Sequence, residues 1–157
     1  MKTAFITSPV GVLDVIGDAN GLVSVKFMDT SEGISHEVPS ELEEAVSQLS
    51  DYFEGKRTEF SLKLAPKGTE FQKKVWAELE EIPFGRTTSY QQMANKLGDP
   101  KVIRAAASAN GKNPIAIVVP CHRVIGSDGS LTGYAGGLHR KKWLLEHESP
   151  AKQQSLF

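Results

Sequence analysis

The sequence predicts an α+β protein in which a small antiparallel sheet with one helix precedes a helical, winged helix-turn-helix region. Strand-like segments gather in the first thirty residues, whereas the patterns after residue 66 are mostly helical. Charge divides at the same place, because the first 65 residues carry five Lys or Arg against eleven Asp or Glu, and the rest carries thirteen against eight. We expect an N-terminal structural domain over residues 1–65, a C-terminal functional domain over residues 66–150 and a flexible tail over residues 151–157.

Three strands are expected at the N-terminus. Residues 4–6 form a short one, and two longer apolar segments, 10–16 and 22–27, flank Asp18-Ala19-Asn20-Gly21. Asn-Gly between apolar segments is typical of a β-hairpin, because these residues tolerate the positive φ angles of the turn. The first thirty residues therefore predict an antiparallel arrangement.

One helix is expected to follow the strands. Ser40 and Glu43 have the spacing of a capping box, an apolar stripe follows them, and Gly55 is expected to end the helix. Residues 60–64 predict an edge strand. This acidic half contains no convincing catalytic set, so we interpret it as structural.

The second half begins with a helix of its own. Thr69 and Gln72 form another capping box, and apolar residues then recur at helical spacing until Pro83. Apolar stripes of this kind are more often core than cofactor contacts, and we interpret this one as core.

A pair of short helices is predicted next. Residues 88–97 form the first, capped at Thr88 or Ser89, residues 98–100 form a tight turn, and residues 101–109 form the second. Helix, glycine-containing turn and helix is the arrangement of a helix-turn-helix motif, although generic helical hairpins share it.

Basic residues cluster around this motif. Residues 86–145 contain nine Lys or Arg and only two Asp. A basic stretch is often only a solvated face, but so one-sided a cluster favours a polyanion as partner. The second helix carries Lys101 and Arg104 beside the small residues 105–109, which let a helix approach a protein core or a DNA groove closely. We therefore interpret the motif as DNA-binding.

The single cysteine, Cys121, ends a short apolar run. Residues 115–119 are too few for a helix and rich in β-branched side chains, so they predict a buried extended segment, and Pro120 keeps its predecessor out of the helical region. A thiol needs a base or a positive field to become a thiolate, and His122 and Arg123 could supply both. The alternative is a buried cysteine that packs as a small apolar side chain.

The residues after the cysteine complete the predicted motif. An Asp-Gly turn within residues 125–131 is interpreted as the wing, and the glycine-rich residues 132–137 as a connection to a last helix over residues 138–148. No GxGxxG stands between a strand and a helix, and the histidines show no zinc-ligand spacing with the cysteine. We expect neither a cofactor nor a metal.

Four blocks of the second half form a recognisable set. They are Asn113-Pro114, Pro120-Cys121-His122-Arg123-Val124, Gly133-Tyr134-Ala135-Gly136-Gly137-Leu138 and Trp143-Leu144-Leu145-Glu146-His147-Glu148. They resemble the O6-alkylguanine-DNA alkyltransferases, also called methylated-DNA–protein-cysteine methyltransferases, and residues 89–94 and 101–104 match that family's helix-turn-helix. The first half matches only in length and order of elements. The resemblance implies a ribonuclease H-like N-terminal domain and direct repair of alkylated DNA.

The resemblance also implies roles in catalysis. Cys121 would accept the alkyl group, and His122 would act through a water as its base. Glu148 would orient His122, and Asn113 would hold the geometry of the site.

Further roles implied by the resemblance concern the flipped base and the duplex. Tyr90 would assist flipping and donate a hydrogen bond to the guanine, and Arg104 would fill the gap that the base leaves. Many relatives have Ser at the position of Ala135, so it is an open question which group makes that hydrogen bond to the guanine oxygen here. The remaining implied contacts are Val124 and Tyr134 in the base pocket and Lys101, Thr88, Ser89 and Arg123 on the DNA.

The chemistry of direct transfer is consistent with these roles. An alkylated base inside a duplex is unreachable until it is extruded. Transfer to sulfur gives a thioether, which water does not cleave, so each molecule acts once. Two alternatives remain: a Cys-His hydrolase, which would turn over, and a non-catalytic sensor of alkylated DNA, a class that lacks the acceptor cysteine.

The C-terminal residues suggest a second partner. Residues 153–157 are close to short peptides that dock on the bacterial DNA sliding clamp. Leu156 and Phe157 would fill an apolar pocket and Gln153 would fix the register, although Gln154 replaces the usual Leu. One cysteine suits a reducing cytosol, and no apolar run is long enough to cross a membrane. We expect a cytoplasmic monomer with no membrane partner.

Overall fold

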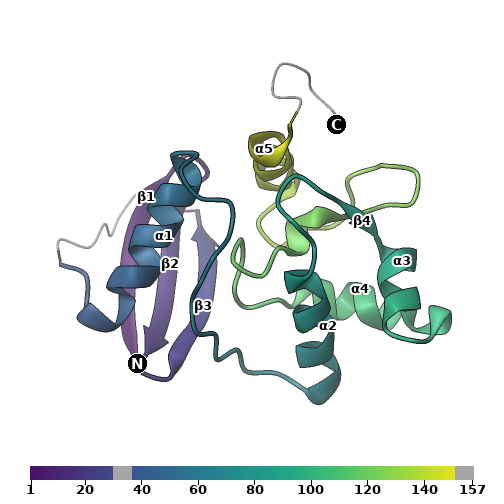
Figure 1. Ribbon diagram of the computed structural model, residues 1–157, viewed down its shortest axis with the longest axis horizontal. Helices are drawn as coiled ribbons and strands as arrows, with labels where there is room; N and C mark the ends of the chain where they lie inside the picture. The colour runs from purple at the N-terminus through teal and green to yellow at the C-terminus, as the bar shows by residue number, and fades with distance from the viewer. Residues whose placement is uncertain (30–36, 151–157) are drawn as a thin grey trace. The chain divides into compact units, whose positions relative to one another are not determined.

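The computed structural model describes residues 1–29 and 37–150. The described residues form two compact units. The first consists of Met1–Lys67 together with Pro114–Ala116, and the second of the remaining described residues. Strands dominate the first unit and helices the second (Figure 1), so the predicted α+β class is confirmed.

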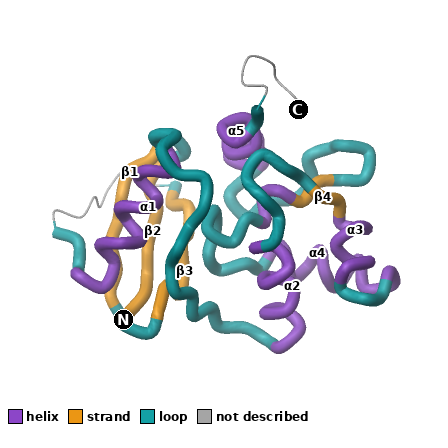
Figure 2. Tube along the Cα trace, in the orientation of Figure 1, coloured by secondary structure: helices purple, strands orange, loops and turns teal. Residues whose placement is uncertain are grey.

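An antiparallel sheet forms the base of the first unit. Its strands are β1 (Lys2–Ser8), β2 (Gly11–Asp18) and β3 (Gly21–Met28), paired in that order (Figure 2). Leu13 and Val15 of the middle strand are fully buried, as expected for a sheet with a core-facing side. The predicted hairpin turn is confirmed: Asn20 N donates to Asp18 Oδ1 (2.8 Å), and Gly21 has a φ of 139°.

One helix follows the sheet in this unit. A 3-10 turn, η1 (Ser40–Leu42), leads into α1 (Glu43–Phe53). The predicted capping box at Ser40 is wrong, because the tighter turn comes first and Ser40 Oγ donates to Glu41 Oε1 (3.1 Å) instead. The predicted end is confirmed, since Gly55 has a φ of 76° and donates its N–H to Tyr52 O.

The predicted edge strand over residues 60–64 is wrong except at one point, a parallel bridge between Leu22 and Leu64. A side chain takes the place of the missing strand partner. Ser61 N donates to Gln48 Oε1 (3.0 Å), and Gln48 Nε2 donates back to Ser61 O (3.3 Å). Because buried Gln48 satisfies this backbone, the segment needs no strand partner at that point.

Pro114–Ala116 returns to the sheet of the first unit. Val25 N donates to Pro114 O (2.9 Å), and Ala116 N donates to Val25 O (3.1 Å). The predicted extended segment over residues 115–119 is therefore confirmed only at Ile115. Residues 116–118 form turns, and Ile117 has a φ of 73°, which is rare for a β-branched residue. The run is nonetheless buried, as predicted.

Helices make up most of the second unit. They are α2 (Glu70–Glu80), α3 (Tyr90–Lys96), α4 (Ile103–Gly111) and α5 (Leu138–Glu148), with a 3-10 turn η2 (Pro100–Val102) before α4. The capping box of Thr69 and Gln72 is confirmed, and Ser89 caps α3 by accepting from Gln92 N (3.1 Å). The helix–turn–helix arrangement of α3 and α4 is likewise confirmed.

The small residues of α4 serve the protein core as well as the surface. Ala106 and Ala109 are buried, and Trp76 Nε1 of α2 donates to Ala109 O (2.9 Å). Ala105 and Ser108 are exposed. The buried small residues therefore let α4 pack closely against α2. The exposed side of α4, with Ala105 and Ser108, is available to another molecule.

A very short sheet joins the motif to the cysteine segment. β4 (Thr88–Ser89) pairs in parallel with β5 (Val124–Ile125). After β5, Gly126 N donates to Ser130 O (2.9 Å) and closes a turn at Asp128-Gly129, where the wing was predicted. Within residues 1–29 and 37–150, no helix has the length and apolar character needed to cross a membrane.

Candidate active site

Cys121 follows a tight turn that is stabilised by hydrogen bonds from the backbone and from a side chain. Pro120 has φ −82° and ψ 63°, the geometry of an inverse γ-turn, and Cys121 N donates to Val119 O (2.8 Å). Asn113 Nδ2 donates to the same carbonyl oxygen (2.8 Å). Asn113 thus fixes the residue before the turn, and Cys121 lies at the start of the 3-10 turn η3 (Cys121–Arg123) with only 6% of its surface exposed.

His122 and Glu148 form a buried pair behind the thiol. His122 Nε2 lies 2.7 Å from Glu148 Oε2, and both side chains are almost completely buried. Burial alone would raise the pKa of Glu148, but His122 and Arg123 outweigh it and lower that pKa to about 2. The ionised carboxylate can only accept, so the neutral imidazole donates through Nε2 and keeps its lone pair on Nδ1. Within the described residues, Nδ1 has no hydrogen-bond partner.

Burial also decides the resting state of the thiol. It raises the pKa of Cys121, and the Asn113 side chain, the positive charge of Lys141 and the Tyr134 hydroxyl offset this only in part. The resting thiol is therefore protonated at neutral pH, and it needs a base at the moment of reaction. Burial likewise lowers the pKa of His122, against the opposing pull of Glu148, so the imidazole is neutral and able to accept a proton.

The structure corrects the prediction that Arg123 contacts DNA. Its side chain is buried and is paired with Glu148, with Arg123 Nε 2.7 Å from Glu148 Oε1. We therefore remove it from the DNA-contacting set. The remaining members lie at the motif: Arg104 and Lys101 are exposed, Ser89 is the cap of α3, and Thr88 Oγ1 donates to Gln92 Oε1 (3.0 Å).

Lys141 is a site residue that the sequence analysis missed. It lies on α5, is completely buried, and donates through Nζ to Thr132 O (2.8 Å). Its ammonium lies 5.9 Å from the centre of the Tyr90 ring, and burial lowers its pKa to about 8, partly opposed by Cys121. The helical spacing from Leu144 and Glu148 was the available signal, because it places Lys141 on the inner face of the last helix.

A pocket of about 710 Å³ lies within the second unit. Tyr90, Arg104, Tyr134 and Ala135, four of the residues singled out from the sequence, line it together with Ala107 of α4. Val124 is not among its lining residues; it is fully buried in β5. The buried Tyr134 hydroxyl, whose pKa is raised by burial, interacts with the Cys121 thiol and so connects the pocket to the sulfur.

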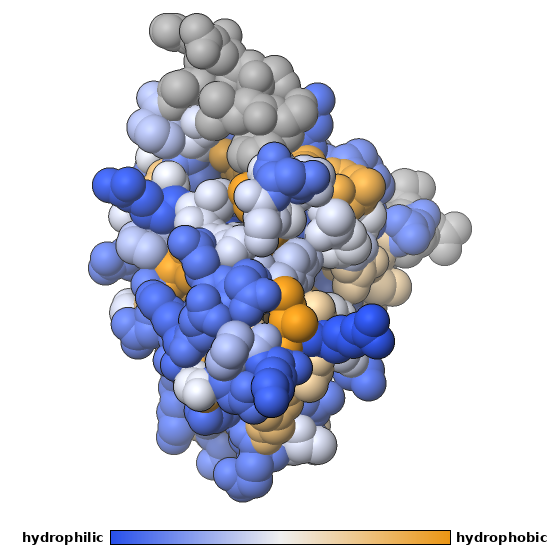
Figure 3. Space-filling view, turned by 90° about the vertical axis from the view of Figure 1, so that its right-hand side faces the viewer, coloured by the Kyte–Doolittle hydropathy of each residue, from blue (hydrophilic) through white to orange (hydrophobic). Residues whose placement is uncertain are grey.

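The surface around this motif is polar. The side of the molecule that bears α3 and α4 is mostly hydrophilic, with small separate apolar patches (Figure 3). Among the described residues, no group of three or more His, Cys, Asp or Glu could hold a metal ion.

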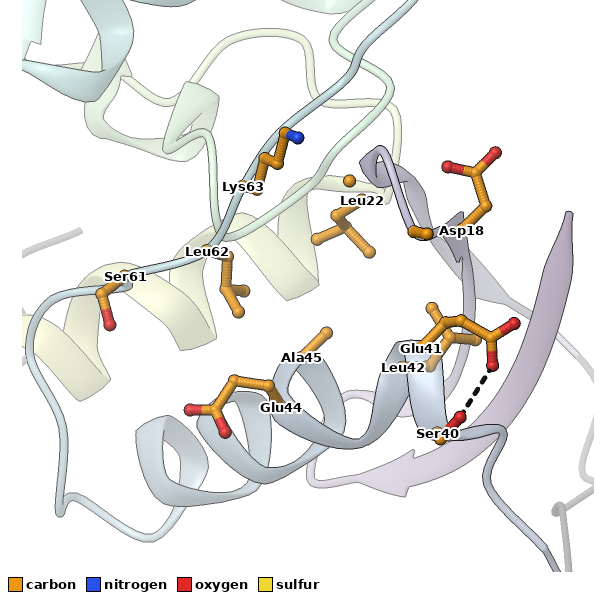
Figure 4. A pocket seen from close by; sticks show the side chains of 12 residues that line it. Asp18, Leu22, Ser40, Glu41, Leu42, Glu44, Ala45, Ser61, Leu62 and Lys63 are labelled. Carbon is orange, nitrogen blue, oxygen red and sulfur yellow. Dashed lines mark hydrogen bonds between the residues drawn. The ribbon is translucent and has the colours of Figure 1, made fainter.

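A second pocket belongs to the first unit. It has a volume of about 420 Å³ and lies between α1, the segment at Leu62 and the turn after β2 (Figure 4). Its floor is apolar, and Glu41 and Glu44 at its rim are exposed. The residues that line it include no Cys, His or Tyr.

Comparison with known proteins gives the family. The model described as 6-O-methylguanine DNA methyltransferase, DNA binding domain, matches residues 70–150, and the model described as its ribonuclease-like domain matches residues 1–66. The methylated-DNA–protein-cysteine methyltransferase of Methanosarcina acetivorans is 49% identical over 155 residues, covering 94% of this chain and 98% of the relative. The Mycobacterium tuberculosis relative of the same name is 46% identical over 147 residues, covering 91% and 89%.

A solved structure agrees with these matches along the whole chain. The crystal structure of Mycobacterium tuberculosis OGT in complex with DNA has a TM-score of 0.85 and 44% identity, and it covers 99% of this chain and 98% of its own. The resemblance that the sequence suggested is confirmed, now for the N-terminal unit as well. A buried Cys-His-Glu arrangement, a helix-turn-helix motif and these matches agree: this chain belongs to the methylated-DNA–protein-cysteine methyltransferase family.

Proposed function

We propose that this protein repairs DNA by moving the alkyl group of O6-alkylguanine to Cys121, with the residues around that thiol in the roles given below. Membership of the family gives the reaction, and the residue roles are our inference. One observation carries them: the only cysteine of the chain is seated beside a buried His122–Glu148 pair and next to a pocket that reaches the motif. O4-alkylthymine is a second candidate lesion for the same pocket.

The transfer step requires a base and a proton donor. As Cys121 Sγ attacks the alkyl carbon, its proton passes through a water to His122, whose Nδ1 has no hydrogen-bond partner among the described residues. The bond between that carbon and guanine O6 breaks, and the electron pair stays on the leaving base. Tyr90, which lines the pocket, donates a hydrogen bond to that base; the base takes up one proton from water, and His122 returns the thiol proton to water. The products are S-alkylcysteine and unmodified guanine, and the protein does not regenerate.

Asn113 and Glu148 hold the reacting groups. Asn113 fixes the carbonyl that the Cys121 turn depends on, and Glu148 sets the tautomer of His122. Tyr134 and Ala135 bound the space for the base. At Ala135 the side chain offers no hydroxyl, so hydrogen bonds to the guanine oxygen come from other groups.

DNA is the macromolecular partner, as the DNA-binding domain and the DNA-bound relative indicate. We propose that the helix-turn-helix binds the backbone and that Arg104, exposed on α4 at the edge of the pocket, occupies the space of the extruded base. Lys101 would contact phosphate. Such contacts depend strongly on salt and weakly on sequence.

The decisive experiment is intact mass spectrometry of the full chain after incubation with methylated duplex DNA. One methylene per protein molecule, on the peptide that contains Cys121, is the expected result. A Cys-His hydrolase would instead turn over many substrates without a stable adduct, and a non-catalytic sensor would bind the DNA and gain no mass.

The remaining expectations concern partners and location. We propose a cytoplasmic monomer that reaches newly replicated DNA through the sliding clamp; Gln153, Leu156 and Phe157 of that interaction lie outside the described residues. Deleting residues 153–157 should abolish binding to purified clamp and leave repair of a short duplex unchanged. No clamp binding by the full chain would end the clamp proposal, and sedimentation of the free protein tests the monomer.

A further inference from the structure

Arg123 connects three segments of the second unit from a buried position. Its Nε lies 2.7 Å from Glu148 Oε1, one terminal nitrogen lies 3.1 Å from Glu148 Oε2, and the other donates to Ile82 O (2.6 Å). The guanidinium carbon is 5.9 Å from the centre of the Phe84 ring. A forked, charge-assisted contact of this kind fixes the plane of the carboxylate as well as its position.

The same carboxylate holds the imidazole. Glu148 Oε2 accepts from both Arg123 and His122, and Oε1 accepts from Arg123. The carboxylate therefore cannot rotate toward or away from His122 without breaking at least one bond to Arg123. Because all three side chains are buried, water cannot readily replace a lost bond.

We propose that Arg123 is a positioning residue for alkyl transfer: its fork on Glu148 fixes the ring and the tautomer of His122, so that Nδ1 is the nitrogen free to take the thiol proton. This inference rests on the proposed roles of His122 and Glu148. The sequence suggested a DNA contact and a positive field on the thiol for Arg123; the fork instead gives it a role through Glu148 and His122.

The charges around the pair support this assignment. The charged groups that act on His122 are Glu148, Arg123 and Lys141, and the nearby titratable groups are Cys121 and Tyr134. Burial lowers the pKa of His122, Glu148 raises it, and Arg123 and Lys141 lower it again. Removing the charge of Arg123 therefore raises the pKa of His122, and more of the imidazole is protonated and lost as a base at a given pH.

A competing interpretation is that Arg123 only braces the fold through Ile82 O. Stability measurements cannot separate the two interpretations, because losing any partner of a buried carboxylate destabilises a protein. Because the charge of Arg123 acts on His122 in either case, the variant that separates the two interpretations must keep the charge and remove the fork. In such a variant a positioning residue slows transfer per folded molecule, whereas a brace does not.

The experiment uses the full chain with Arg123→Met and Arg123→Lys. Single-turnover transfer from methylated duplex DNA is measured across pH, and the His122 ring is titrated by NMR. In Arg123→Met we expect His122 to titrate at higher pH than in the native protein, and the acid limb of the rate profile to move up with it. Transfer at neutral pH should fall by at least about tenfold, part of what a positioned base contributes. Arg123→Lys keeps the charge but not the fork, so His122 should titrate close to its native pH while transfer is still slower than in the native protein.

Val75→Ala serves as the control for general destabilisation, since Val75 is fully buried on α2 and is not part of the proposed site. It should leave the His122 titration and the rate profile of the folded protein unchanged. The inference is overturned if folded Arg123→Lys transfers the alkyl group at the native rate, as this control does. Should Arg123→Met fail to fold, Arg123→Lys carries the same test. If native protein gains no alkyl group on Cys121, the proposed function fails, whereas the NMR titration still reports on Arg123.

Discussion

The two units bury polar side chains in different ways. In the first unit, the neutral amide of Gln48 is buried and exchanges hydrogen bonds with Ser61. In the second unit, His122, Arg123, Lys141 and Glu148 are all buried, and each can carry charge. Burying a charge costs far more than burying a satisfied amide. The difference indicates where the molecule performs chemistry and where it only maintains its fold.

This comparison predicts that substitutions in the second unit act mainly on the reaction, and substitutions in the first unit mainly on stability. The following changes test that division, beginning with the largest expected effect on alkyl transfer.

Cys121→Ala should abolish transfer completely and leave DNA binding intact, because the acceptor atom is removed and no other thiol exists in the chain. Intact mass and a gel-shift assay with the same duplex measure the two properties. Residual mass gain in this variant would mean that another side chain accepts the alkyl group.

Glu148→Gln should reduce transfer by about 10² to 10⁴, because an amide can donate to His122 Nε2 and place the proton on the wrong ring nitrogen. It should also raise the apparent pKa of Cys121 in iodoacetamide labelling across pH. Glu146→Gln is the matched control on the same helix, since the Glu146 side chain is partly exposed and its ion pair with Lys142 is long (3.9 Å). Equal labelling profiles in the two variants would show that Glu148 does not poise the thiol.

The same carboxylate predicts a pH dependence of stability. The pKa of Glu148 is lowered from 4.5 to about 2 in the folded protein, so its ionisation stabilises the fold above pH 4.5. That contribution is lost as the pH falls from 4.5 toward 2. Urea unfolding of native protein and Glu148→Gln across this range should show a smaller acid-induced loss in the variant; parallel curves would contradict the prediction.

Arg104→Ala should slow repair in duplex DNA by about tenfold or more while changing transfer from free O6-methylguanine base little, because only the duplex requires base extrusion. Lys96→Ala, at an exposed position of α3, is the control for loss of one positive charge. Equal losses on duplex and free base would assign Arg104 to the fold instead.

Leu49→Ala in the first unit should have the smallest effect on the reaction. Leu49 is fully buried on α1, so truncation should reduce the free energy of unfolding by about 2–5 kcal/mol. The rate of transfer per folded molecule should stay unchanged. A lower rate at full folding would mean that the first unit takes part in catalysis, and the division between the units would be incorrect.

Local rules in the sequence predicted the elements well where one short-range interaction determines them. The Asn20-Gly21 turn and the Thr69–Gln72 capping box involve residues at most three apart, and both are confirmed. Ser40 does not cap α1, because a 3-10 turn precedes that helix. Whether such a turn forms depends on the direction from which the chain reaches the helix. The segment before Cys121 failed as a strand because turns at residues 116–118 follow its single bridge to Val25.

The sequence by itself determined the fold class, the helix-turn-helix and the nucleophile, because hydrophobic period, capping spacing and a unique cysteine are local properties. Only the tertiary structure decided the roles of Arg123 and Lys141. From sequence, both were basic residues within a basic cluster that favoured DNA, and Arg123 was also a possible source of a positive field for the thiol. Folding brings Arg123 to Glu148, 25 residues away, and brings Lys141 close enough to act on Cys121, 20 residues away. No short sequence pattern specifies that these two side chains are buried. Because they are buried, water screens their charges poorly, and the charges act on the groups of the site.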